Sequence, residues 1–256
     1  MTSVDNCKHT AYKALHRKIA MGVLPPGSRV SEFSTAKELR ISRAPVREAL
    51  SQLESEGFVE KIPGFGAFVK VPTLDELGEL YEFREALENF AVARAAERIN
   101  AQQLADLQEC CDATKKILGT MRDAGSRDMD DPTAARWIEL DLRFHTTILA
   151  AAGNRSIERH VTDVRLLGRV WGKRLDSRVW NVFSVLVRSW SDHRRILSAL
   201  RRHDAQAAQR AMSHHIRETG KRFLRQMRDL GPSLRAWPAS EAYQRLLEIH
   251  PRAMES

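Results

Sequence analysis

The chain has 256 residues, of which 43% are hydrophobic and 29% are charged, an ordinary balance for a globular protein with room for two modest domains. No apolar run reaches the ~18 residues that span a bilayer, and the first ten residues lack the apolar core of a secretory signal. The three cysteines, Cys7, Cys110 and Cys111, have neither disulfide-framework nor CxxC spacing. We therefore expect a cytoplasmic protein with no membrane partner.

The net charge of +8 is unevenly distributed along the chain. Residues 1–72 carry 11 basic and 7 acidic side chains, residues 73–145 carry 9 and 16, and residues 146–256 carry 21 and 10. A basic N-terminal unit beside an acidic segment indicates that the two parts of the chain have different functions. By charge, however, the last third is the stronger nucleic-acid candidate. Charge alone therefore does not assign the function.

The first 72 residues begin with two short helices. Tyr12, Leu15 and Ile19 recur at helical spacing, and the Leu-Pro-Pro-Gly turn at 24–27 ends this helix. A second helix is expected at about 32–39. Its buried face is expected to comprise Phe33, Ala36 and Leu39.

A third helix and a β-hairpin are expected next. Ser42 is placed to cap the helix, and Gly57 ends it. Two β-prone runs, 58–62 and 67–71, flank a Pro-Gly-Phe-Gly turn and predict a hairpin. Three helices followed by a hairpin is the order of a winged helix-turn-helix, whose third helix enters the major groove of DNA. The buried face of that helix is expected to comprise Val46, Ala49, Leu50 and Leu53.

The solvent face of the third helix carries two arginines. Arg43 and Arg47 lie four residues apart, opposite the apolar face, and Ser42 and Ala44 lie at the same end. Arginine is the side chain best suited to the paired acceptors of guanine. On pattern alone, the alternative is an amphipathic helix with a solvated charged face.

Several stretches of this region carry a family signature. They are Leu-Pro-Pro-Gly-Ser-Arg-Val-Ser-Glu at 24–32, Ile-Ser-Arg-Ala-Pro-Val-Arg-Glu-Ala-Leu at 41–50, Glu-Gly-Phe-Val at 56–59 and Gly-Ala-Phe-Val at 66–69. With them, the chain closely resembles the GntR family of bacterial regulators over residues 10–71. The resemblance implies contacts with double-stranded operator DNA by Ser42, Arg43, Ala44, Arg47 and the wing glycine Gly66.

Three residues depart from the family pattern. Arg40 stands where glycine is usual, which strains the turn by ~1 kcal/mol if the backbone is left-handed there. Thr35 replaces a usual leucine. Phe65 stands at the wing tip, where a basic or polar residue is more common, and this puts the wing's phosphate contact in question.

From Leu74 onward the sequence predicts helices and no strands. Six segments are expected, at 74–98, 101–122, 133–152, 154–174, 179–202 and 204–229. The fold class is therefore mainly α, with a winged helix-turn-helix at 1–72, an all-helical bundle at 73–230 and a C-terminal tail at 231–256. The apolar run 179–187 is a candidate interface for a homodimer.

One aspartate and three histidines lie on apolar helix faces in this bundle. Asp141 and His145 are four residues apart and share a face. His193 and His215 lie on later helices. Buried charge is costly without a partner, and these four side chains would resolve that cost by converging on a divalent cation. The alternative is a set of separate, hydrogen-bonded core residues.

The same half of the chain carries a second set of family marks. They are Leu-Tyr-Glu-Phe-Arg-Glu-Ala-Leu-Glu at 80–88, Asp-Leu-Arg-Phe-His at 141–145, Gly-Asn at 153–154, His-Arg-Arg-Ile-Leu at 193–197 and Ala-Met-Ser-His-His at 211–215. They resemble the FadR-type C-terminal domain (FCD), the ligand-binding module of one GntR branch. The match spans about residues 74–228.

The FCD resemblance implies a metal and an effector. It places a divalent ion (zinc, nickel or manganese) at Asp141, His145, His193 and His215. It also sets Arg84 against an anionic effector such as a small organic acid or sugar acid. The alternative role for Arg84 is a surface partner of Glu88, four residues on.

Three other functions are alternatives to an effector-controlled regulator with a metal site. No HExxH or other general-base arrangement supports a metalloenzyme. The inward Asp141 and His145 pair counts against an architectural DNA-binding protein, and the intact metal positions count against a metal-free acyl-CoA sensor. We therefore predict a non-enzymatic, homodimeric transcription regulator, a repressor by the family default.

Overall fold

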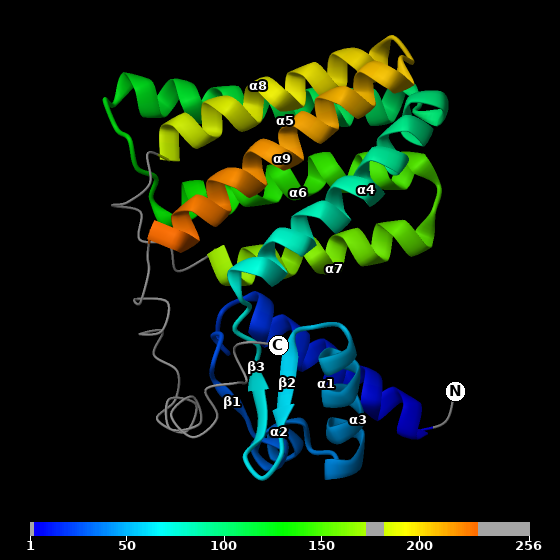
Figure 1. Cartoon of the computed structure of the whole chain (residues 1–256), viewed down its shortest axis with the longest axis vertical. Coiled ribbons are helices and arrows are strands. Elements are labelled where there is room, and N and C mark those ends of the chain that lie inside the picture. The colour runs from blue at the N-terminus through cyan, green and yellow to red at the C-terminus, as the bar shows by residue number, and fades with distance from the viewer. Residues whose placement is uncertain (1–2, 173–181, 230–256) are drawn as a thin grey trace. The chain divides into compact units, whose positions relative to one another are not determined.

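The computed structural model describes residues 3–172 and 182–229 of the chain. Within these ranges the protein is mainly α-helical with one small antiparallel sheet, which confirms the predicted fold class (Figure 1). Contacts divide the described residues into two compact units. One comprises residues 3–77 together with the ends of two later helices (165–172 and 225–229), and the other comprises residues 78–164 and 182–224.

The N-terminal unit combines short helices with a three-stranded sheet. Its elements are α1 (Ser3–Ala20), β1 (Arg29–Val30), α2 (Glu32–Leu39), α3 (Arg43–Ser55), β2 (Val59–Ile62) and β3 (Gly66–Val69). Strands β2 and β3 form the predicted hairpin, and the sheet order is β1-β3-β2. The sequence did not predict β1, because two residues are too few to show an alternating pattern. The strand exists through its pairing with β3, where Arg29 lies opposite Phe68.

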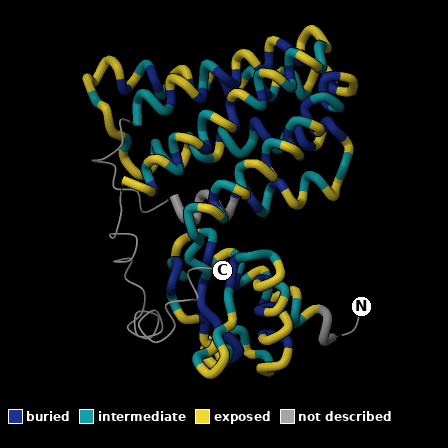
Figure 2. The backbone as a smooth tube through the Cα atoms, in the orientation of Figure 1, coloured by how far each residue is buried: buried dark blue, intermediate teal, exposed yellow. Residues whose placement is uncertain are grey.

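The predicted apolar face of α3 is confirmed, whereas that of α2 is partly wrong. Val46, Ala49, Leu50 and Leu53 of α3 are all fully buried. Figure 2 shows how buried positions, in dark blue, alternate with exposed ones along the helices. In α2, however, Phe33 is 65% exposed, and Thr35 and Ala36 are the buried residues. Position 35 is buried but carries a threonine, so the search for apolar residues selected Phe33, two positions earlier, instead.

Arg40 ends α2 in the left-handed conformation, with φ 55° and ψ 42°. An L side chain there costs ~1 kcal/mol relative to glycine. We therefore expect Arg40→Gly to raise the free energy of unfolding by up to about 1 kcal/mol, seen as a higher denaturant midpoint at unchanged slope. Arg40→Ala keeps the Cβ and should give no such gain. Equal midpoints for the two variants would show that the turn is not strained.

The C-terminal unit is helical throughout its described residues. Its helices are α4 (Leu74–Arg98), α5 (Ala101–Asp123), α6 (Asp131–Ala152), α7 (Arg155–Gly172), α8 (Val182–Arg201) and α9 (Ala205–Asp229). Where a predicted end falls within the described residues, it agrees with the structure to within two residues. The predicted end at 174, the predicted start at 179 and the predicted tail at 231–256 lie outside the described residues. The junctions carry local signals, such as the reciprocal capping box of Asn100 and Gln103 and the left-handed Gly153 after α6.

Five of these helices share one apolar core. Buried side chains from each of them meet there, including Val92 of α4, Leu107 of α5, Phe144 of α6, Ile196 of α8 and Met212 of α9. The inward faces of α6, α8 and α9 form part of this core. None of the described helices is both long and apolar enough to cross a membrane.

The adjacent cysteines of α5 belong to this core. Burial raises the pKa of Cys110 to about 11 and that of Cys111 to about 12, while Cys7 of α1 is only half-buried. Because the thiolate is the reactive form, a thiol reagent near neutral pH should label one cysteine per folded chain. After unfolding it should label all three. Rapid labelling of two or three thiols in the folded protein would show that the core opens readily.

Candidate functional site

The N-terminal end of α3 presents the predicted DNA-reading residues to solvent. Ser42, Arg43, Ala44 and Arg47 are all exposed, and the two arginine side chains are 60% and 61% accessible. Ser42 occupies the N-cap position in an extended conformation, but its hydroxyl makes no capping hydrogen bond. The hydroxyl is therefore available to an external partner.

Both arginines share one carboxylate that the sequence analysis missed. Arg43 Nη2 and Arg47 Nη2 lie 3.4 Å and 3.3 Å from Oε2 of Glu32, at the start of α2. The hydrogen bond from Arg47 lowers the pKa of Glu32 below its usual range, against the opposing effect of partial burial. Glu32 thus keeps the two guanidinium groups at one edge of the unit. Its position in the first turn of α2 gave no signal of this role.

In the wing, the basic side chain of Arg29 lies next to Gly66. This glycine has φ +102°, and a Cβ built there would lie 3.5 Å from the guanidinium of Arg29. Phe65, at the wing tip, packs against Phe68. The wing therefore carries an apolar tip, and Arg29 on the neighbouring strand supplies positive charge beside Gly66.

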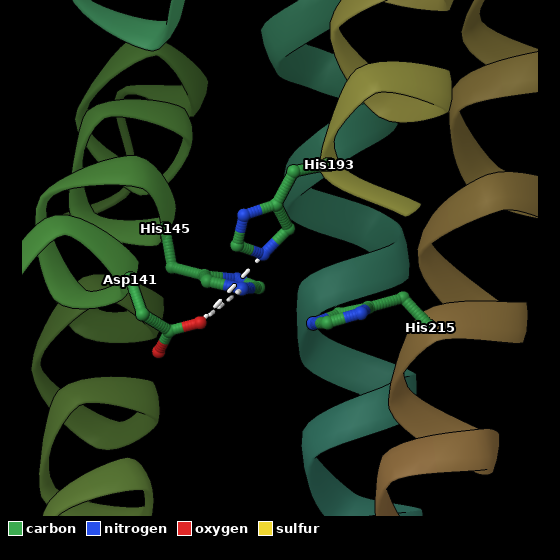
Figure 3. Close-up of side chains that lie close together, drawn as sticks. All are labelled: Asp141, His145, His193 and His215. Atoms are coloured by element: carbon green, nitrogen blue, oxygen red, sulfur yellow. Dashed lines mark ion pairs between the residues drawn. The ribbon is translucent and has the colours of Figure 1, made fainter. Parts of the chain in front are cut away.

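The four predicted metal ligands converge from three helices of the C-terminal unit. Asp141 and His145 project from α6, His193 from α8 and His215 from α9 (Figure 3). One ligand atom from each lies within 4.8 Å of the others. The three histidines are buried, and Asp141 is partly exposed. Sequence spacing could relate only the first two, so this convergence is a result of the tertiary fold.

The geometry of the cluster fits a divalent ion. The Nε2 atoms of His145 and His193 lie 3.9 Å and 3.6 Å from the same oxygen, Oδ1 of Asp141. Metal–ligand bonds of about 2.0–2.1 Å place neighbouring ligand atoms about 3–4 Å apart, which small side-chain shifts would reach here. Imidazole and carboxylate together suit zinc, nickel or manganese. Phe144 stacks on His193, with ring centroids 4.0 Å apart and planes 6° from parallel, which fixes that imidazole.

Two further buried carboxylates adjoin these histidines, and the sequence analysis assigned neither. Glu88 Oε2 lies 2.8 Å from His145 Nδ1. Asp192 Oδ2 lies 3.5 Å from His215 Nδ1, an atom without a hydrogen bond among the described residues. Burial raises the pKa of Asp192, but its contact with His215 and the nearby charge of Arg195 lower it below its usual range. Asp192 is adjacent to His193 in sequence, which alone is a weak signal.

Arg84 lies inside the unit. Its Nε donates a 3.0 Å hydrogen bond to Oε1 of Glu88, and both side chains are buried. Burial lowers the pKa of Arg84, but Glu88, Tyr81 and Asp141 raise it above its usual value, so the guanidinium stays charged. The pairing with Glu88 that spacing suggested is therefore present, but it is internal rather than at the surface.

Other histidines of the unit lie apart from the cluster. His214 is exposed and lies 3.8 Å from Asp192. His160 is bonded to the carbonyl of Ser156, and His203 to that of Ala96. None of them belongs to the cluster found among the described residues.

Both units match known protein families. Residues 8–69 match the bacterial regulatory proteins of the gntR family, and residues 79–218 match the FCD domain. The HTH-type transcriptional repressor RspR of Escherichia coli (strain K12) is 28% identical over 219 residues, which cover 85% of this chain and 88% of that protein. The regulator YdhC of Bacillus subtilis (strain 168), also described as HTH-type, is 26% identical over 223 residues, covering 82% and 92%.

A solved structure shares the fold. The chain resembles E. coli McbR/YncC with a TM-score of 0.63 at 22% identity, covering 89% of this chain and 100% of that one. The FCD match by itself spans more than half of the chain. The chain therefore belongs to the GntR family of bacterial regulatory proteins, in the branch that carries an FCD domain, and it is a DNA-binding transcriptional regulator.

Proposed function

We propose that this regulator is a repressor controlled by a small organic-acid or sugar-acid effector, bound at a divalent metal ion in the C-terminal unit. The observation that carries the proposal is the convergence of Asp141, His145, His193 and His215. FCD domains commonly bind metal, and the relative RspR is named a repressor. We assign DNA binding to residues 1–72 and effector binding to residues 73–230.

The operator contacts that we propose are Ser42, Arg43, Ala44 and Arg47 at the end of α3, with Gly66 in the wing. The exposure of the α3 residues supports this assignment. A glycine without a side chain lets the wing backbone approach phosphates closely, and Arg29 beside it adds positive charge. Phosphate contacts set the position of the protein on DNA, whereas base contacts set its specificity.

We propose that the protein acts as a homodimer on a pseudo-palindromic operator. One winged helix reads only a few base pairs, and a two-fold dimer doubles the contacts and matches an inverted repeat. Of the apolar run 179–187, residues 179–181 lie outside the described residues, and Val187 is 37% exposed. Light scattering at micromolar concentration should give twice the 29.1 kDa chain mass. A monomer that still binds its operator tightly would contradict the dimer.

The proposed metal centre favours an anionic effector. When bound, a divalent ion would act as a Lewis acid toward a carboxylate or hydroxyl oxygen of the effector. Asp141 is the single carboxylate among the four ligands, so the ion and its ligands together would keep a net positive charge. A direct contact between Arg84 and the effector stays a prediction. The Nε atom of Arg84 already donates a hydrogen bond to Glu88. The effector would release DNA only by favouring a helix arrangement that disfavours operator binding.

A ligand screen with an internal control tests this function. Zinc-loaded protein is heated with a panel of small organic and sugar acids, beside the amide of each acid. The active acid should raise the melting temperature with concentration and release a fluorescent operator, while its amide does neither. Equal shifts for metal-free and zinc-loaded protein would contradict effector binding at the metal.

A further inference from the structure

Glu88 of α4 reaches the metal cluster from a helix that supplies none of the four ligands. Its Oε2 accepts a 2.8 Å hydrogen bond from Nδ1 of His145, across a sequence separation of 57 residues. His145 is 0% exposed and Glu88 is 1% exposed, so water does not compete for this bond. A charge-assisted bond in such surroundings fixes both the position of the proton and the plane of the ring.

Arg84 fixes the carboxylate itself. Oε1 of Glu88 accepts from Nε of Arg84 at 3.0 Å, while Oε2 accepts from His145. Each oxygen therefore has its own donor, and the carboxylate cannot turn without losing one of them. The guanidinium also lies over the ring of Tyr81, 5.1 Å from its centroid, which restrains Arg84 in turn.

We propose that Glu88 is a positioning residue of the metal centre: it holds the proton of His145 on Nδ1 and so keeps Nε2, beside Asp141, in the acceptor form that a metal ion requires, with Arg84 holding Glu88 in orientation. The inference rests on the proposed metal-dependent function. It assigns Arg84 an internal role that does not require contact with the effector. Outer-shell partners of this kind raise metal affinity by roughly 10–100-fold.

The isosteric variant Glu88→Gln gives a sharp test. Nε of Arg84 can only donate, so it will hold the amide oxygen and turn the amide NH2 toward His145. Nδ1 must then accept a hydrogen bond, and the proton moves to Nε2. In metal-free protein, long-range 1H–15N correlation of the neutral imidazoles should show His145 with its proton on Nδ1 in the wild type and on Nε2 in the variant. The resonance is assigned by its loss in His145→Ala.

A second variant separates this effect from damage to the fold. In Arg84→Met/Glu88→Gln no buried charge is left unpaired, and the glutamine is free to turn its oxygen toward His145. The proton should therefore return to Nδ1. The matched control is Glu85→Gln on the same helix, since Glu85 bonds instead to Arg217 at 2.8 Å and to Ser213. That control should leave the His145 tautomer unchanged.

Zinc affinity, measured by competition with a chelator, completes the test. Glu88→Gln should bind zinc about 10–100-fold more weakly than the wild type, the double variant should recover part of this loss, and Glu85→Gln should match the wild type. Wild-type protein that binds zinc, with tautomer and affinity unchanged by Glu88→Gln, would overturn this inference alone. Wild-type protein that binds no zinc would overturn the proposed function and this inference with it.

Discussion

His193→Ala should abolish metal binding and the response to effector, while metal-free operator binding stays close to that of the wild type. The substitution removes one of four proposed ligands from α8, so zinc affinity should fall by more than the roughly 10–100-fold expected for an outer-shell partner. The proposed DNA contacts lie in residues 1–72 and are not altered. Elemental analysis after zinc loading, with operator titrations in the presence and absence of effector, measures all three properties.

His214→Ala is the matched control for this experiment. His214 is next to a proposed ligand on α9, but its side chain is 56% exposed, and its loss should leave one zinc ion per chain. Stoichiometric metal in a His145→Ala/His193→Ala double variant would refute the ligand assignment. A wild type that takes up no metal under loading would instead identify the four residues as a polar core network.

Arg47→Ala should weaken operator binding by roughly 1–3 kcal/mol, a loss of about 5- to 150-fold, if Arg47 reads a base. The loss should be large on the true operator and small on unrelated DNA, so that discrimination between the two falls. The protein itself should stay folded, because the Arg47 side chain is 61% exposed and its ion pair with Glu32 contributes little to stability. Fluorescence anisotropy on both DNAs at several salt concentrations provides the measurement.

Lys61→Ala provides the contrast for Arg47. Lys61 lies on strand β2 of the wing, where its ammonium group bonds to Ser51 at 2.6 Å and to Glu54 at 2.9 Å. A phosphate contact from this position would be independent of sequence. Its removal should cause a small, uniform loss and a shallower salt dependence. If both variants lose the same affinity on every DNA, Arg47 contacts only the phosphate backbone of the DNA and reads no base.

Helix positions could be predicted here because their signals are local. Asn100 and Gln103 cap α5 through contacts within one turn, and Gly153 ends α6 by its own conformation. Strand β1 could not be predicted, because its two residues are extended only through pairing with β3. Phe33 was misplaced since the position that α2 buries carries a polar residue, Thr35.

The candidate site was predictable only in part. The spacing of Asp141 and His145 placed two ligands on one face, and the family resemblance supplied His193 and His215. Glu88 was interpreted as a surface residue because a glutamate four residues after an arginine is typical of an exposed helical pair. Its contact with His145 joins α4 to α6, and periodicity within one helix carries no information about the neighbouring one.

The origin of the four proposed ligands on α6, α8 and α9 would make a shared ion a cross-link between segments distant in sequence. An unfolded chain would not hold the ion in this way, so occupancy would stabilise the native state by mass action, by about 2.7 kcal/mol when free metal is 100 times its dissociation constant. The quantity of the folded regulator, a repressor in the function that we propose, would then follow the supply of metal in the cell. Metal starvation would relieve repression by shortening the lifetime of the protein, without any effector at all.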